Sequence, residues 1–136
     1  MKLLLTSAGI KNGSINNALV DLLGKPIDEC DALCIPTASY GHPRLGPVAA
    51  WQFITGRAPT PMCELGWKSL GVLELTALPS IDEEQWVPMV QEADALLVGG
   101  GAVMPCTCAT GCASLASLTS SRRSARSMWV LAAGAW

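Results

Sequence analysis

The sequence predicts an α/β protein in which helices cover both faces of a parallel sheet. Short apolar runs of strand length alternate with segments that carry helix caps or helical spacing, and the connections between them are short. The chain length agrees with this prediction, because 136 residues, half of them hydrophobic, suffice for one domain with a buried core.

The first half of the chain contains two predicted strands and two predicted helices. The first strand is expected at Lys2 to Ala8, an apolar run that is closed by glycines. A helix should be capped at Ser14 and should end at Gly24, because glycine readily adopts the left-handed conformation of a helix end. The second strand is predicted at Asp31 to Ile35, and a helix led by proline at Val48 to Thr55.

Three shorter elements are expected further along the chain. Cys63 to Ser69 is predicted as a short helix and Val72 to Thr76 as the third strand. The apolar run Ala95 to Val98 is predicted as the fourth strand, and three glycines follow it directly.

A longer helix is predicted between the third and fourth strands. Ser80 is followed three residues later by Glu83, which is the spacing of a capping box. The helix is expected to continue to Ala93, with a kink at Pro88, since proline lacks the backbone N–H that an interior helical position uses.

Composition excludes several classes of function. A net charge of -2 and an isoelectric point near 5.2 give no basic surface for nucleic acid. No apolar stretch approaches the ~18 residues of a membrane span, and no signal peptide is recognised. We therefore expect neither nucleic acid nor membrane as a partner, and a cytoplasmic protein whose six cysteines are reduced thiols.

The candidate binding site lies in the loops that follow the predicted strands, because ligands of parallel sheets bind beyond the carboxyl ends of the strands. Gly99, Gly100 and Gly101 expose bare backbone N–H groups there, which could cradle an oxyanion or a phosphate. A plain glycine-rich turn between strand and helix explains them equally well. Neither a Walker loop nor a dinucleotide fingerprint accompanies them, so no cofactor is expected.

A second candidate is the loop Thr37 to Gly46, which contains the chain's one histidine. His42, with Tyr40 and Arg44 close by in sequence, could orient a substrate or titrate near neutral pH. A solvated loop histidine is the favoured interpretation, because loop side chains are commonly exposed.

The cysteines do not predict a metal site. Cys106, Cys108 and Cys112 are closely spaced, but no histidine or second cysteine pair accompanies them at zinc spacing. Cys30 and Cys34 are expected to pack around the second strand as small hydrophobic residues.

Three segments resemble one known family. Leu3 to Gly9, Ile35 to Ala38 after the second strand, and Ala93 to Gly101 are similar to the amino-terminal half of the dipeptidase E family of aspartyl dipeptidases. The resemblance covers residues 1–101 and implies an incomplete doubly wound sheet of the flavodoxin-like, class I glutamine amidotransferase-like kind. It implies a cytoplasmic serine-type hydrolase without a cofactor, whose small peptide substrates begin with aspartate. In this family the glycine turn meets the oxyanion, and a later strand ends in Gly-x-Ser-Ala-Gly.

The chain departs from this family where the chemistry would lie. Ala102 stands where the family has Asn or Asp, Ala132 stands where the nucleophilic serine would align, and no histidine or acid follows Gly101. No catalytic residue can therefore be assigned, and we expect an inactive member truncated before its catalytic residues. The alternative is a non-catalytic α/β binding or interaction module that holds a small acidic ligand through the loops Thr37 to Gly46 and Gly99 to Gly101.

Residues 102–136 differ in composition from residues 1–101, which hold all eleven acidic residues. One hypothesis is that this segment is a frame-shifted reading of a dipeptidase E-like gene. If the third base of each codon is read with the first two bases of the next, the codons of Met128-Trp129 must encode Val and those of Trp129-Val130 must encode Gly. The codons that follow permit the rest of a Gly-x-Ser-x-Gly motif. The other is a divergent tail with a final strand at Met128 to Ala133. The sequence of the encoding DNA distinguishes the two.

This organisation has a physical consequence for association. Four strands without a fifth would leave an open edge and an uncovered sheet face, so the chain is expected to self-associate and to be poorly soluble.

Overall fold

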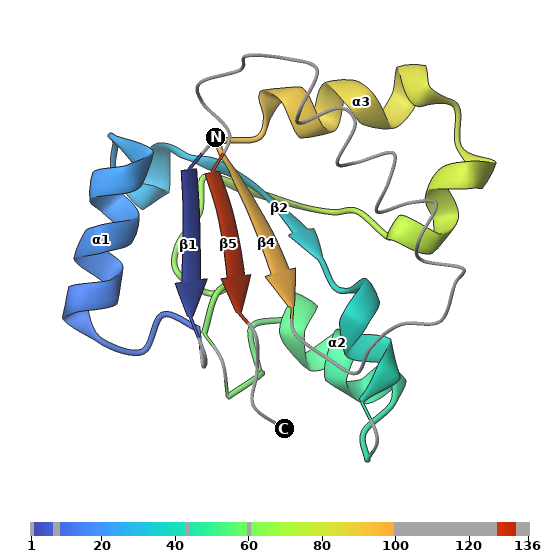
Figure 1. The fold of residues 1–136 in the computed structure, drawn as a ribbon, viewed down its shortest axis with the longest axis horizontal. Coiled ribbons are helices and arrows are strands. Elements are labelled where there is room, and N and C mark those ends of the chain that lie inside the picture. The colour runs from blue at the N-terminus through green and yellow to red at the C-terminus, as the bar shows by residue number, and fades with distance from the viewer. Residues whose placement is uncertain (1, 7–8, 43, 60, 100–127, 133–136) are drawn as a thin grey trace.

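The structure, a computed structural model, describes residues 2–6, 9–42, 44–59, 61–99 and 128–132. These residues form a five-stranded sheet in the order β1-β5-β4-β2-β3, with every pair of neighbours parallel (Figure 1). The strands are β1 (Lys2–Thr6), β2 (Asp31–Ile35), β3 (Ser69–Val72), β4 (Ala95–Gly99) and β5 (Met128–Ala132). The predicted α/β class is confirmed.

Three α-helices and three short 3₁₀ helices connect the strands in the described part of the chain. The α-helices are α1 (Gly13–Leu23), α2 (Pro47–Ile54) and α3 (Glu83–Glu92). The 3₁₀ helices are η1 (Ile27–Glu29), η2 (Thr37–Gly41) and η3 (Leu75–Ser80). In Figure 1, α1 lies beside β1 at one side of the sheet, and α2 lies near the carboxyl end of β4.

The two faces of the sheet bury separate hydrophobic clusters. Ala32 and Cys34 of β2 pack in a cluster with Leu19 of α1 and Phe53 of α2. Leu33, between them in sequence, packs in the other cluster with residues of η3 and α3. Because successive strand residues point to opposite faces, helices cover this sheet on both sides, as the apolar strands predict.

The ends of α1 are fixed by two local interactions. Asn12, not the predicted Ser14, caps the helix, because its side chain accepts a hydrogen bond from Ile15 N at 2.9 Å. The carboxyl end lies at Gly24, as predicted, where a φ of 75° places the residue in the left-handed region.

The third strand begins earlier than predicted. The predicted strand Val72 to Thr76 is wrong in its bounds, because β3 ends at Val72 and η3 begins three residues later. The predicted helix Cys63 to Ser69 is also wrong, because this segment forms turns and the start of β3. Pairing with β2 decides this: Lys68 N donates to Cys30 O at 3.0 Å, and the Ser69 hydroxyl donates to the Asp31 carboxylate at 2.6 Å. Such long-range contacts override the local pattern.

The predicted capping box before α3 is also wrong. Ser80 is the last residue of η3, and Asp82 is the N-cap of α3 without a side-chain hydrogen bond. The acidic residues Glu83 and Glu84 occupy the first turn, where they favourably oppose the helix dipole. Pro88 lies inside the helix, as expected.

The prediction of a sheet that lacks its fifth strand is wrong. Residues Met128–Ala132 form β5, which lies between β1 and β4 and pairs in parallel with both. The final strand predicted at Met128 to Ala133 is thus confirmed to within one residue. Among the described residues, β1 and β3 are the two edges of the sheet.

Candidate functional site

The carboxyl ends of all five strands lie along one edge of the sheet, because the strands are parallel. In Figure 1 this edge is at the bottom, on the side of α2. Gly99, the last residue of β4, is in register with Ala132, the last residue of β5. Ligands of parallel sheets bind beyond this edge, so its cavities are candidates for a site.

A cavity of about 180 Å³ lies at this edge, between the segments that follow β2 and β3. Its lining residues are Thr37 and Tyr40 of η2, with Glu74 and Thr76 at the start of η3. Thr37 is buried, whereas Tyr40 is 46% exposed at the mouth of the cavity. The lining is therefore made of one carboxylate, two aliphatic hydroxyls and one phenol.

Glu74 is the most extensively hydrogen-bonded of these residues. Its Oε1 accepts from the Thr37 hydroxyl at 2.5 Å and from the Thr76 hydroxyl and backbone N at 3.2 and 3.5 Å. Thr37 Oγ1 in turn accepts from Leu75 N at 2.9 Å, which fixes the hydroxyl in place. Glu74 Oε2 is buried, and no described residue donates to it. One oxygen of the carboxylate thus accepts three hydrogen bonds, whereas the other is buried and accepts none from the described residues.

None of the described residues that line this cavity is cationic. The described ion pairs, Lys25 with Asp94 and Lys68 with Asp31, involve residues at the opposite, amino-terminal edge of the sheet. The pKa of the nearby Cys34 thiol is raised by its hydrogen bond with Cys63, by burial and by the charge of Cys63, and the charge of Glu74 adds to this shift.

Gly99 has a packing role at this edge. A Cβ added at Gly99 would lie 2.7 Å from Ser39 Oγ and 3.1 Å from the ring of Phe53. These distances are shorter than ordinary van der Waals contact, so the position requires glycine. Gly100 and Gly101 lie outside the described residues, and the predicted oxyanion cradle therefore stays a prediction.

His42 takes part in a turn. Its Nδ1 accepts hydrogen bonds from Arg44 N at 3.2 Å and from Leu45 N at 3.1 Å. This arrangement assigns the ring proton to Nε2 and occupies the Nδ1 lone pair. Of the three residues singled out in this loop, only Tyr40 lines the cavity; His42 and Arg44 do not.

The described cysteines are free thiols. Cys30 and Cys34 are buried, as predicted, and Cys30 Sγ donates to Pro26 O at 3.2 Å. Cys106, Cys108 and Cys112 lie outside the described residues. Among the residues that are described, no group of three histidine, cysteine or acidic side chains could hold a metal ion.

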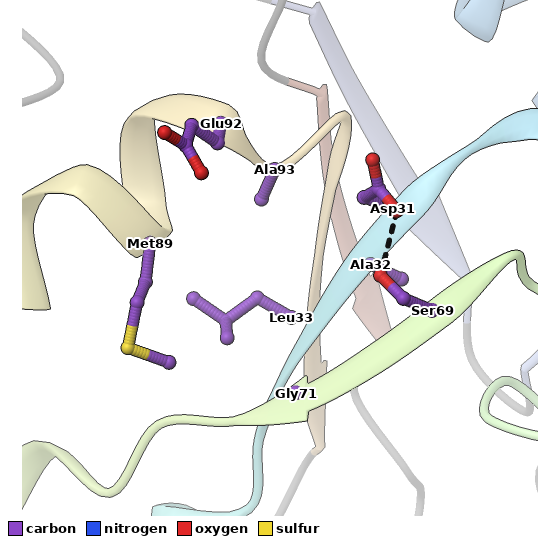
Figure 2. A pocket seen from close by; sticks show the side chains of 8 residues that line it. All are labelled: Asp31, Ala32, Leu33, Ser69, Gly71, Met89, Glu92 and Ala93. Atoms are coloured by element: carbon purple, nitrogen blue, oxygen red, sulfur yellow. Dashed lines mark hydrogen bonds between the residues drawn. The ribbon is translucent and has the colours of Figure 1, made fainter.

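A second cavity, of about 300 Å³, lies at the amino-terminal edge between α3 and β3. Figure 2 shows Asp31 and Ser69 joined by their hydrogen bond on one side, and Met89 and Glu92 of α3 on the other. The Asp31 carboxylate already pairs with Ser69 and with Lys68, 3.8 Å away. Of its two carboxylates, Asp31 is already paired and Glu92 is exposed to solvent, so this open groove is a weaker candidate than the cavity beside the partly buried Glu74.

Sequence reasoning missed Glu74 and Thr76, because both were assigned to the predicted strand Val72 to Thr76, which in the structure ends at Val72. A usable signal was present: Glu74 follows the apolar run of β3, and an acidic residue directly after a parallel strand stands at the ligand-binding edge. Thr37 and Tyr40 were within a loop that was predicted to face ligands.

No protein-family model, curated protein or solved structure matches this chain. In the part of the chain that the structure describes, no helix is both long and apolar enough to cross a membrane. The fold and the cavity define a parallel α/β protein with a small pocket beside the Glu74 carboxylate, at the carboxyl edge of its sheet.

Proposed function

We propose that this chain is a dipeptidase E-like α/β domain that binds a small ligand at the carboxyl edge of its sheet and does not hydrolyse it. The observation that carries the binding role is the cavity beside Glu74, where a buried carboxylate oxygen receives no hydrogen bond from the described residues. Buried polar atoms are normally paired, so an orphaned one at a ligand-binding edge favours a bound group.

The detailed arrangement of the sheet is part of the same proposal. A doubly wound, flavodoxin-like sheet of the class I glutamine amidotransferase-like kind is supported by parallel strands with helical segments on both faces. The position of β5 agrees with it as well: after its glycine turn the family continues to the strand that carries its serine, and here β5 pairs beside β4.

The absence of turnover is argued from the residues. Ala132 stands where the serine would align, and residues 102–136 contain no histidine and no acid. His42 Nδ1 already accepts two backbone hydrogen bonds, so this nitrogen is not free to take a proton from a nucleophile. Ser39 lies beside Gly99, but it is only 3% exposed, whereas a nucleophile must reach its substrate.

The test combines a hydrolysis assay with a binding assay. The chain is incubated with aspartyl-leucine, and free leucine is quantified; we expect no release above the rate of a blank without protein. In parallel, thermal shifts are recorded with a panel of amino acids, dipeptides, carboxylic acids and amines, and at least one member should stabilise the chain. Leucine release that Ser39→Ala abolishes would show that the chain is an enzyme.

A serine peptidase is the second candidate, through the frame-shift hypothesis for residues 102–136. The location of β5 favours it, because a frame restored there would end this strand with the family's serine motif beside the end of β4. Sequencing of the encoding DNA tests it: an alternative frame with stop codons, or one without the motif, ends the hypothesis. The chain with its frame restored should hydrolyse aspartyl-leucine.

We also propose a cytoplasmic location. The support is limited to cysteine chemistry: Cys30, Cys34 and Cys63 are free thiols, which is typical of reducing compartments. Fractionation of cells that express the chain at its natural level would test this proposal.

A further inference from the structure

We propose that the cavity beside Glu74 binds a primary ammonium group, such as the free α-amino group of an amino acid or a short peptide. This inference rests on the proposed function, which holds that the carboxyl edge binds a small ligand, and it specifies the chemical class of that ligand. The argument uses the charge, the hydrogen-bonding groups and the volume of the cavity.

The first step is charge. Glu74 is the one carboxylic acid among the four described lining residues, and none of the four is a lysine, arginine or histidine. No described residue forms an ion pair with its carboxylate. A partly buried carboxylate without a counter-ion attracts a cation and repels an anionic group such as a carboxylate or phosphate. The cavity is therefore unsuited to the acidic end of a ligand.

The second step is the match of hydrogen bonds. Glu74 Oε1 already receives the donors of Thr37 and Thr76, so Oε2 is the acceptor that remains. The Thr76 hydroxyl uses its proton on Glu74 and keeps lone pairs, and the Tyr40 hydroxyl can also accept. Three acceptors of this kind match an ammonium group, which carries three N–H donors.

The third step is size. A volume of about 180 Å³ is below the roughly 300 to 1,000 Å³ of pockets that enclose a whole drug-sized ligand. The cavity therefore holds one end of a molecule, and the remainder extends outward past Tyr40, which is 46% exposed. A monovalent ammonium is also preferred over a divalent metal ion, because Ca²⁺ takes six to eight oxygen ligands, and often several carboxylates.

The experiment compares two probes that differ at the amino group. Isothermal titration calorimetry is performed with aspartyl-leucine and with N-acetyl-aspartyl-leucine, and methylamine serves as the minimal ammonium probe. We expect aspartyl-leucine to bind at least about tenfold more tightly than its acetylated form, since acetylation removes the charge and blocks the donors. Methylamine should compete with aspartyl-leucine.

The decisive variant is Glu74→Gln. A glutamine keeps an acceptor oxygen for Thr37 and Thr76, but it places an NH₂ donor at the Oε2 position. Binding of aspartyl-leucine should weaken at least about tenfold, while binding of the acetylated form should be unchanged. Glu84→Gln makes the same chemical change at an exposed position of α3 that lines neither cavity, and it should leave both affinities unchanged. Urea denaturation of each variant controls for folding.

A second variant covers the case in which Glu74→Gln fails to fold. Thr76→Val removes one acceptor from the cavity and retains the carboxylate. It should weaken the binding of aspartyl-leucine by a smaller factor, about three- to tenfold. Equal affinity for the free and acetylated dipeptides, or an aspartyl-leucine affinity that the chosen cavity variant leaves unchanged, would overturn the inference.

The outcomes also separate this inference from the proposed function. If carboxylic acids without an amine bind and amines do not, the ammonium inference is wrong and the ligand-binding role stands. If no member of the panel binds, both fail. Hydrolysis of aspartyl-leucine with the expected preference for a free amine would overturn the non-catalytic role and support the ammonium site.

Discussion

Ser39 Oγ lies 2.7 Å from the position that a Cβ at residue 99 would occupy. The ring of Phe53 lies 3.1 Å from the same position, so the end of β4 is packed directly against η2 and α2. A glycine after a buried strand is thus explained by packing before any role in catalysis is considered. The contact also joins the end of β4 to η2, which contributes Thr37 and Tyr40 to the Glu74 cavity.

Gly99→Ala should destabilise the chain by about 1 to 3 kcal/mol, because the added methyl group overlaps Ser39 and Phe53. The measurement is the free energy of unfolding from urea denaturation. The control is Gly13→Ala, where nothing lies within 4 Å of the added Cβ; it should leave stability unchanged or raise it by up to ~1 kcal/mol. Equal stability of the Gly99→Ala variant and the unchanged chain would refute the packing role.

Asp94→Asn should lower stability by about 1 kcal/mol at pH 7. Burial alone would raise the pKa of Asp94, but hydrogen bonds from Lys25 Nζ, at 2.8 Å, and Asp31 N, at 2.9 Å, lower it below the ordinary value. A lowered pKa in the folded state stabilises the fold above the unfolded pKa of about 3.9, and this contribution is lost as the pH falls through the folded value.

The difference between Asp94→Asn and the unchanged chain should therefore shrink steadily below about pH 4. Urea denaturation at a series of pH values measures it. Asp21→Asn, at an exposed position of α1, serves as the control and should stay within about 0.5 kcal/mol of the unchanged chain at each pH. A constant difference for Asp94→Asn from pH 7 to pH 3 would contradict the assigned hydrogen bonds.

Cys34 should resist alkylation in the folded chain. Cys34 and Cys63 share a hydrogen bond with their Sγ atoms 3.7 Å apart, and this bond, together with burial and the nearby charges, raises the pKa of the Cys34 thiol. Since the thiolate is the nucleophile, a raised pKa suppresses the reaction. With iodoacetamide at pH 8, we expect Cys34 to be labelled at least about a hundredfold more slowly than in guanidinium chloride, as quantified by peptide mass spectrometry. Similar rates in the two conditions would contradict its buried, protonated state.

The sequence predicts the central part of this fold well. The apolar runs at β1, β2 and β4 contain enough hydrophobic residues in a row to identify strands, and β2 and β4 are buried on both faces. The last strand was also locatable, because Met128–Ala132 is apolar, but its place between β1 and β4 depends on pairing with residues far away in the chain. Local patterns carry no information about such partners.

The errors have a common physical cause. The start of β3 is set by hydrogen bonds to β2, at Ser69 and Lys68, and its end by the contacts of Glu74 with η2. The candidate site was only half predicted for the same reason. The loop after β2 was identified, whereas Glu74 was assigned to the predicted third strand. In the structure this strand ends two residues before Glu74.

We expect the chain to self-associate through β3. β3 is an edge strand of the described sheet, and its four residues contain none of the lysine or proline that commonly protects such edges. Leu70 and Val72 are 37% and 45% exposed, and they neighbour Ala32 and Cys34 of β2 in the parallel register. A second chain that pairs with β3 would cover these side chains and satisfy the outward backbone groups.

Val72→Lys should therefore weaken self-association, which sedimentation velocity measures over a range of concentrations. A lysine at an edge strand opposes pairing because a second strand would have to desolvate its charge. Val48→Lys is a matched control: Val48 is 47% exposed, close to Val72, but it lies on α2 and not on a sheet edge. The edge model predicts that Val48→Lys leaves association unchanged. A chain that is monomeric at every concentration, or a Val48→Lys variant that dissociates as fully as Val72→Lys, is incompatible with pairing through β3.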